Sequence, residues 1–190
     1  MKNLLRISLA TAALSLVLSV AARAAEDPGY VDIGQLLPST KGQFVEVNLS
    51  QGMLKFAAKL AAREEPECAD LIANLKRIRV NVVGLDDNNR AGTLEQIESV
   101  RRKLESQGWT QIVKVRETEK GDNVDIHVRQ TSDEVIEGLV ITVIDHKGEA
   151  VFVNIVGNIH VDQLSKIADK FDIEPLKHVH INGRGRADEA

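Results

Sequence analysis

Residues 138–171, GLVITVIDHKGEAVFVNIVGNIHVDQLSKIADKF, decide the fold of this chain. Leu139–Ile144 and Ala150–Val156 are rich in β-branched residues, which predicts two buried strands. Asp145–Gly148 has the composition of a hairpin turn, because Asp caps its own backbone and Gly accepts a positive φ. After a break at Gly157, apolar residues follow at helical spacing: Leu164, Ile167, Ala168 and Phe171. A hairpin with a helix folded onto one face is a minimal two-layer core.

The first 24 residues have the pattern of a secretory signal peptide. Lys2 and Arg6 precede an apolar run over residues 7–20, and Ala22-Arg23-Ala24 supplies a small-residue cleavage site. The run is too short to span a membrane comfortably, although an uncleaved anchor is the alternative. No other stretch is long and apolar enough to span one. We therefore expect a periplasmic or secreted protein with no membrane span after signal removal.

Charge and cysteine content narrow the class of protein. The chain has 24 basic and 28 acidic residues, a net charge of −4. Removing residues 1–24 takes away three basic residues and no acidic one, so the mature chain would carry −7. This balance suits solubility and argues against general nucleic-acid binding. Cys68 is the only cysteine, so an intramolecular disulfide is impossible, and its position on an apolar helix face predicts a small buried residue.

The rest of the chain divides into regular elements. Alternating polarity predicts strands over 44–49, 77–85, 111–118 and 123–130. Helical spacing predicts helices over 53–61, 66–75 and 93–104, the first with one apolar face: Met53, Leu54, Phe56, Ala57, Leu60 and Ala61. Thr93 and Gln96 fit a capping box, Gly108 fits the C′ position, and Trp109 is expected to anchor this helix to the sheet.

This order of elements predicts an α+β fold with a single, mainly antiparallel sheet and helices packed on one face. Two small helix-on-sheet halves, packed side by side, are the alternative. We expect four segments: a signal peptide over 1–24, a flexible lead-in over 25–43, one domain over 44–181 and a flexible tail over 182–190.

The polar sheet face is the feature with the clearest potential for binding. Alternation places charged, hydrogen-bonding and apolar side chains together on the side expected to lie opposite the helices. A face of this mixed kind can bind a partner, although an ordinary solvated face is the alternative. The candidate partner-binding residues are Arg79, Arg116, His127, Arg129, Phe152 and Asn154.

The sequence offers weak signals for catalysis. No nucleophile elbow accompanies His127, and a solvated surface histidine is the simpler interpretation. His178 and His180 would point to the same side of an extended chain, but no further residue has metal-ligand spacing. We therefore expect no cofactor, no metal site and no catalytic residues, with a periplasmic metal-dependent hydrolase using histidines as the alternative function.

The chain resembles the bacterial family catalogued as domain of unknown function 4252. The resemblance rests on Trp109 before a strand, on Gly138-Leu139-Val140, and on the run from Val153 to Ile159 leading to Leu164. It covers about residues 43–181, and departs from the family at His160, where a capping Asp is usual. It implies an exported, non-catalytic protein linked to envelope sensing or regulation. We therefore expect a binding or interaction module whose partner is an envelope protein or a small ligand.

Overall fold

The computed structural model describes residues 27–34, 36, 42–116, 123–160 and 163. They form six strands and three helices in the order β1 (Phe44–Ser50), α1 (Gln51–Ala61), α2 (Pro66–Ala73), β2 (Leu75–Gly84), α3 (Arg90–Ser106), β3 (Thr110–Arg116), β4 (Asn123–Gln130), β5 (Val135–Ile144) and β6 (Glu149–His160). The predicted helix over 164–171, the signal peptide and the tail lie outside these residues.

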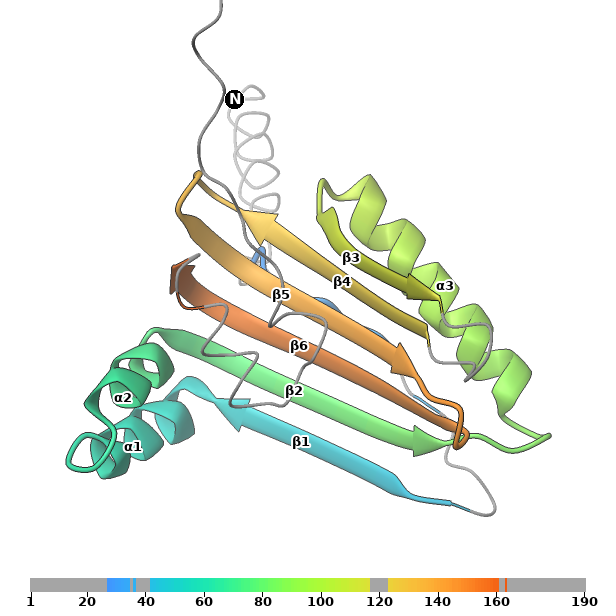
Figure 1. The fold of residues 1–190 in the computed structure, drawn as a ribbon, viewed down its shortest axis with the longest axis horizontal. Coiled ribbons are helices and arrows are strands. Elements are labelled where there is room, and N and C mark those ends of the chain that lie inside the picture. The colour runs from blue at the N-terminus through green and yellow to red at the C-terminus, as the bar shows by residue number, and fades with distance from the viewer. Residues whose placement is uncertain (1–26, 35, 37–41, 117–122, 161–162, 164–190) are drawn as a thin grey trace, which may run out of the picture.

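One antiparallel sheet organises the described residues, with strand order β1-β2-β6-β5-β4-β3 (Figure 1). The meander from β3 to β6 needs only hairpin connections. The Asp145–Gly148 turn between β5 and β6 has the expected chemistry: Gly148 has a φ of 86°, and the Glu149 N–H donates to Asp145 Oδ1 at 2.8 Å. The α+β class and the single antiparallel sheet are therefore confirmed.

The first sheet face, which we call the apolar face, carries only aliphatic side chains in its core. Ile78 pairs with Ile155, Ile155 with Leu139, and Leu139 with Val128, so one apolar row crosses four strands. Leu54 of α1 and Leu71 of α2 pack against the same cluster. This face follows directly from the β-branched, period-two pattern of the strands.

The second face, which we call the mixed face, is covered by α3 and by the segment over 27–34. Val100 and Leu104 of α3 pack with Val31, Phe152 and Val140 in a second core. The helices therefore lie on both faces of the sheet, not on one as the sequence predicted. The reason is topological: β2 and β3 lie far apart in the sheet, so α3 must cross a face to connect them (Figure 1).

The predicted flexible lead-in is also corrected by the structure. Val31 and Ile33 are 1% and 4% exposed, so residues 27–34 are part of the core. The segment can pack on the sheet because two glycines approach each other closely. A Cβ on Gly138 would lie 2.6 Å from Gly29 Cα and 2.5 Å from Trp109 Cη2. Only glycine leaves room for the segment and for the Trp109 ring. Trp109 packs with Leu104 of α3 and Val140 of the sheet, and so anchors the helix to the sheet as predicted.

The start of α3 differs from the sequence expectation. The helix begins at Arg90 with Asn89 at the N-cap, so Thr93 lies inside the first turns and is buried. Asn89 Oδ1 accepts a hydrogen bond from the Asp86 N–H at 2.8 Å, which closes the preceding loop. Gln96, the expected partner in the capping box, instead donates through Nε2 to the Ile33 carbonyl oxygen. Gly108, with a φ of 79°, ends the helix as predicted.

Candidate functional site

The mixed face gathers the six candidate residues on the predicted side of the sheet. Arg79 pairs with Asn154, Asn154 with Val140, and Val140 with His127, which makes one row across β2, β6, β5 and β4. Phe152 lies two residues before Asn154 on the same side of β6. The alternation therefore predicted correctly that these side chains share a face.

Three of the six candidates are closed off from any partner. Phe152, Asn154 and His127 are 4%, 0% and 1% exposed, because α3 and residues 27–34 cover them. A face that is already occupied by the chain's own segments cannot bind a second molecule through these side chains. The expectation of an open, solvated face is corrected here.

Asn154 holds the lead-in segment on the sheet. Its Oδ1 accepts a hydrogen bond from the Val31 N–H at 3.0 Å, and its Nδ2 donates to the Gly29 carbonyl at 3.0 Å and to the Leu139 carbonyl at 3.3 Å. One buried amide thus satisfies polar backbone groups of two segments that are more than a hundred residues apart in sequence. Asn154 is a structural residue in this fold.

The three arginines also bind groups of the chain itself. Arg116 forms a bidentate ion pair with Asp125, with Nη2 at 2.8 Å and 2.7 Å from the two carboxylate oxygens. Arg129 donates through Nε to Glu137 at 2.8 Å. Each of these cations therefore already has an anionic partner, which leaves little charge for an acidic ligand.

Arg79 lies where the lead-in segment meets β1 and β2. Its Nη1 is 3.4 Å from the Tyr30 hydroxyl and 3.6 Å from an Asp32 carboxylate oxygen. Its Nη2 is 3.7 Å from a Glu46 carboxylate oxygen. The Arg79 side chain is 15% exposed, so it acts as a link between the segment and the sheet edge.

His127 is buried, and neither of its ring nitrogens has a hydrogen-bond partner among the described residues. Burial holds the pKa of His127 below its ordinary value of 6.5, and the nearby Asp125 carboxylate opposes this shift. An imidazole without an orienting partner or a neighbouring nucleophile lacks the geometry of a general base. Within the described parts of the chain, no three His, Cys, Asp or Glu side chains gather to hold a metal ion. His178 and His180 lie outside the described residues.

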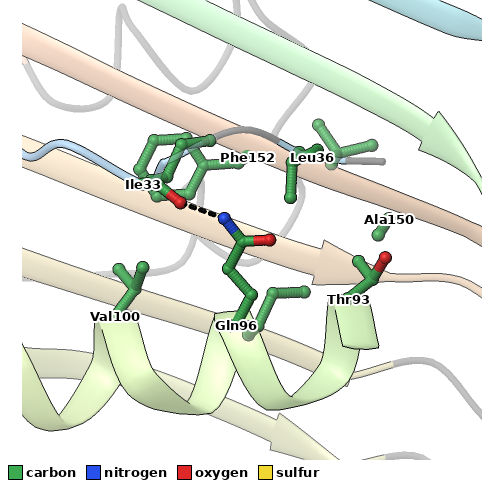
Figure 2. Close-up of a pocket in the computed structure, with 9 residues that line it drawn as sticks. Ile33, Leu36, Thr93, Gln96, Val100, Ala150 and Phe152 are labelled. Carbon is green, nitrogen blue, oxygen red and sulfur yellow. Dashed lines mark hydrogen bonds between the residues drawn. The ribbon is translucent and has the colours of Figure 1, made fainter. Parts of the chain in front are cut away.

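A small apolar cavity opens at the border between the lead-in segment, α3 and β6 (Figure 2). The residues that line it include Ile33 and Leu36, Ile97 and Val100 of α3, and Phe152 of β6. The hydrogen bond from Gln96 to the Ile33 carbonyl crosses it, as the dashed line in Figure 2 shows. Among the described residues that line the cavity none titrates, and Thr93 and Gln96 are the polar ones.

The surface that sequence reasoning missed lies on α1. Met53, Phe56 and Leu60 are 54%, 65% and 65% exposed, although all three were assigned to the core face. The residues of α1 that are buried are Leu54 and Ala58. Spacing of i, i+3 and i+7 places the three exposed side chains in one stripe, which we call the α1 stripe. The sequence did contain this signal. A short surface helix with apolar residues on most of its circumference has more apolar surface than a single core can cover.

Basic side chains accompany this stripe. Lys55 and Lys59 are exposed four residues apart, which places both on one flank of α1, and Arg63 is exposed in the turn that follows the helix. α1 contains no acidic residue between Gln51 and Ala61. The α1 stripe is therefore an apolar surface with a positively charged border.

A comparison with known families gives one match. The family model described as Domain of unknown function (DUF4252) matches residues 39–167. The chain belongs to this family. No curated protein and no solved structure matches the chain.

The matched range contains the whole sheet and all three helices of the described residues. All three of the features that carried the resemblance have a structural role in this DUF4252 chain. Trp109 and Gly138 form the contact that seats α3 and the lead-in segment, and a Cβ on Gly157 would lie 2.6 Å from the Asn74 carbonyl oxygen. No helix in the described part of the chain is long and apolar enough to cross a membrane.

Proposed function

We propose that this chain is a non-catalytic interaction module of the bacterial envelope that docks onto a partner protein through the α1 stripe. The observation that carries the proposal is the exposure of Met53, Phe56 and Leu60 on a helix that already buries its other side. An exposed cluster of large apolar side chains on a folded domain is typical of an interaction site.

The geometry of the stripe suits a helix-in-groove complex. Apolar anchors at i, i+3 and i+7 are the pattern by which an amphipathic helix lies in a hydrophobic groove. The flank of Lys55, Lys59 and Arg63 favours a groove with an acidic rim, because complementary charge steers association and fixes orientation. The partner is therefore a protein with an apolar groove bordered by Asp or Glu.

The proposed location comes from the N-terminal sequence. A basic start, an apolar run over residues 7–20 and an Ala-x-Ala site favour export, and the envelope is where an exported protein meets a partner. A role in envelope sensing or regulation is consistent with a small module that offers one docking helix. The proposal thus combines export with a protein–protein contact.

Site-specific photo-crosslinking in the producing cell tests the proposal. A photoreactive phenylalanine at position 56 is expected to crosslink to one discrete envelope protein. The matched control carries the same group at Glu95, an exposed position on α3. A second substitution, Leu60→Ser, is expected to abolish the crosslink from position 56, because it removes an adjacent anchor.

The purified partner must then bind the wild-type mature chain and bind the Phe56→Ser and Lys59→Glu variants more weakly. Crosslinks to lipid, crosslinks to a second copy of the chain alone, or the same products from positions 56 and 95 would each contradict the proposal. Urea unfolding followed by Trp109 fluorescence checks that the variants remain folded. Phe56 and Lys59 are exposed, so the fold should be unaffected.

A further inference from the structure

The two outer strands of the sheet differ in how they are protected. β1 and β3 are the edges of the sheet that the described residues form (Figure 1). Exposed edges are templates for pairing with another chain, and native proteins block them with bulges, lysines, prolines or covering segments. β3 has a register shift between Gln111 and Val113 and an exposed Lys114. The β3 edge is therefore protected in two ways.

In the part of the chain that the structure describes, the β1 edge has none of these protections. β1 pairs with β2 through seven consecutive residues, from Phe44↔Val83 to Ser50↔Arg77, without a register shift. Its sequence, FVEVNLS, contains no Lys, Arg or Pro. Among the described residues, no segment other than β2 pairs with it. The outward N–H and C=O groups of a regular seven-residue strand are thus available for hydrogen bonding.

We propose that β1 pairs antiparallel with β1 of a second copy of this chain, with the two-fold axis at Val47. In this register Glu46 lies opposite Asn48 of the second copy, and Val45 lies opposite its Leu49. An amide opposite a carboxylate is a complementary pair, and it occurs twice because the interface is symmetric. Within one chain Asn48 Nδ2 already donates to Glu46 Oε1 at 2.8 Å, which shows that these two side chains suit each other.

Alternative registers are less favourable. A shift of two residues toward the N-terminus places Glu46 opposite Glu46 of the second copy, which brings like charges together. A shift of one residue moves Val45, Val47 and Leu49 to the opposite face from their equivalents. The proposed register keeps these three on the apolar face of one continuous sheet, where Leu49 already packs against the core.

The same contrast between edges sets the size of the assembly. A chain with two open edges would add copies without limit, whereas a chain with one open edge forms a closed pair. Because β3 is protected, pairing through β1 ends at the dimer. This surface is distinct from the α1 stripe, so the dimer and the proposed partner complex can fail independently.

Sedimentation equilibrium on the purified mature chain tests the proposal, from low to high micromolar concentration. The wild-type protein is expected to be a dimer. Asn48→Glu is expected to weaken the dimer at least about tenfold, because it places two acidic side chains opposite each other on both sides of the axis. The matched control is Thr110→Glu, an equally exposed change on the β3 edge, which should leave the dimer intact.

A charge rescue makes the test specific for the register. Glu46→Lys combined with Asn48→Glu places Lys opposite Glu and is expected to restore the dimer. Trp109 fluorescence and circular dichroism check the fold of each variant, since Glu46 and Asn48 both lie beside Arg79. A monomeric wild-type protein, an unweakened Asn48→Glu dimer, or a folded double variant that stays monomeric would each overturn the proposal.

Discussion

Each face of this sheet has a buried core, but the two cores are held together by different forces. The apolar face is an aliphatic layer in which Leu139 and Ile155 are both fully buried. The mixed face buries Asn81, Asp125, His127, Thr142 and Asn154 alongside Phe152. Aliphatic packing tolerates any segment of suitable shape, whereas each buried polar group requires a defined partner. The mixed face therefore selects residues 27–34, the segment whose backbone groups satisfy Asn154.

The largest effect expected on the mixed face is at Phe152. Phe152→Ala should destabilise the protein by about 3–5 kcal/mol, because it opens a cavity below Ile33 and α3. Leu139→Ala, on the apolar face, should cost about 2–5 kcal/mol and serves as the reference. Urea unfolding followed by the single Trp109 measures both. If Phe152→Ala cost less than about 1 kcal/mol, the mixed face would behave as solvated surface, and the comparison between the faces would fail.

Asn154 is expected to show the next largest effect. Asn154→Ala should cost about 2 kcal/mol, because the Val31 N–H and the Gly29 carbonyl lose their partners in a buried setting. Hydrogen exchange should rise across residues 27–34, since the amide that holds this segment is gone.

Asn81 provides the matched control for Asn154. It is also buried on the mixed face, but its Oδ1 accepts no hydrogen bond from the described residues. Asn81→Ala should therefore cost clearly less and leave exchange at residues 27–34 unchanged. Equal losses at the two asparagines would mean that the cost comes from lost packing, and the specific role of Asn154 would be disproved.

Much of this architecture was predictable from periodicity, and the exceptions have physical causes. Alternation predicted which side chains of β2, β4, β5 and β6 share a face, because side chains alternate between the two faces of a strand. It could not show which face is covered, since that depends on where α3 crosses. Pro28, Gly29 and Gly34 made the lead-in look like a loop, although Val31-Asp32-Ile33 already alternates in the manner of a packed segment.

The candidate site was less predictable than the fold. Polar side chains on a strand predict a solvated face only if nothing packs over them, and Asn154 and His127 are covered by segments distant in sequence. The α1 stripe was missed for the opposite reason. Six apolar residues were assigned to one core face, but the neighbouring α2 and sheet bury only Leu54 and Ala58 of α1. An amphipathic pattern predicts that a helix has an apolar face. It does not predict whether other parts of the same chain bury that face.

His127 makes the mixed face sensitive to pH in a way that the apolar face is not. Burial lowers the pKa of His127 in the folded state, so the unfolded chain binds a proton at a higher pH than the folded one. The stability contributed by neutral His127 is fully present above about pH 6.5 and is lost as the pH falls toward its folded-state pKa. We expect unfolding free energy to decrease between pH 7 and the folded-state pKa.

Asp125 and Glu105 favour the charged form of His127, whereas burial and Arg101 disfavour it. The slope of the unfolding free energy against pH therefore measures the net result of these opposing effects. His127→Leu should flatten the slope in this range, while His160→Gln, at an exposed position, should retain it. Urea titrations at a series of pH values provide the measurement. A His127→Leu protein with the wild-type slope would assign the pH dependence to other groups.

The smallest effect is expected at Arg129, where the mixed face reaches solvent. Arg129 pairs with Glu137 at 2.8 Å, but the two side chains are 31% and 21% exposed, so water screens the pair. Arg129→Ala should therefore cost no more than about 1 kcal/mol.

Arg116→Ala is the comparison. Asp125 is only 10% exposed and would lose a bidentate partner, so this substitution should cost more. Urea unfolding at low and high salt separates the two, since salt should reduce the Arg129 effect and leave most of the Arg116 effect. If Arg129→Ala lowered the unfolding free energy as much as Arg116→Ala does, water would not screen the Arg129–Glu137 pair, and the prediction would be wrong.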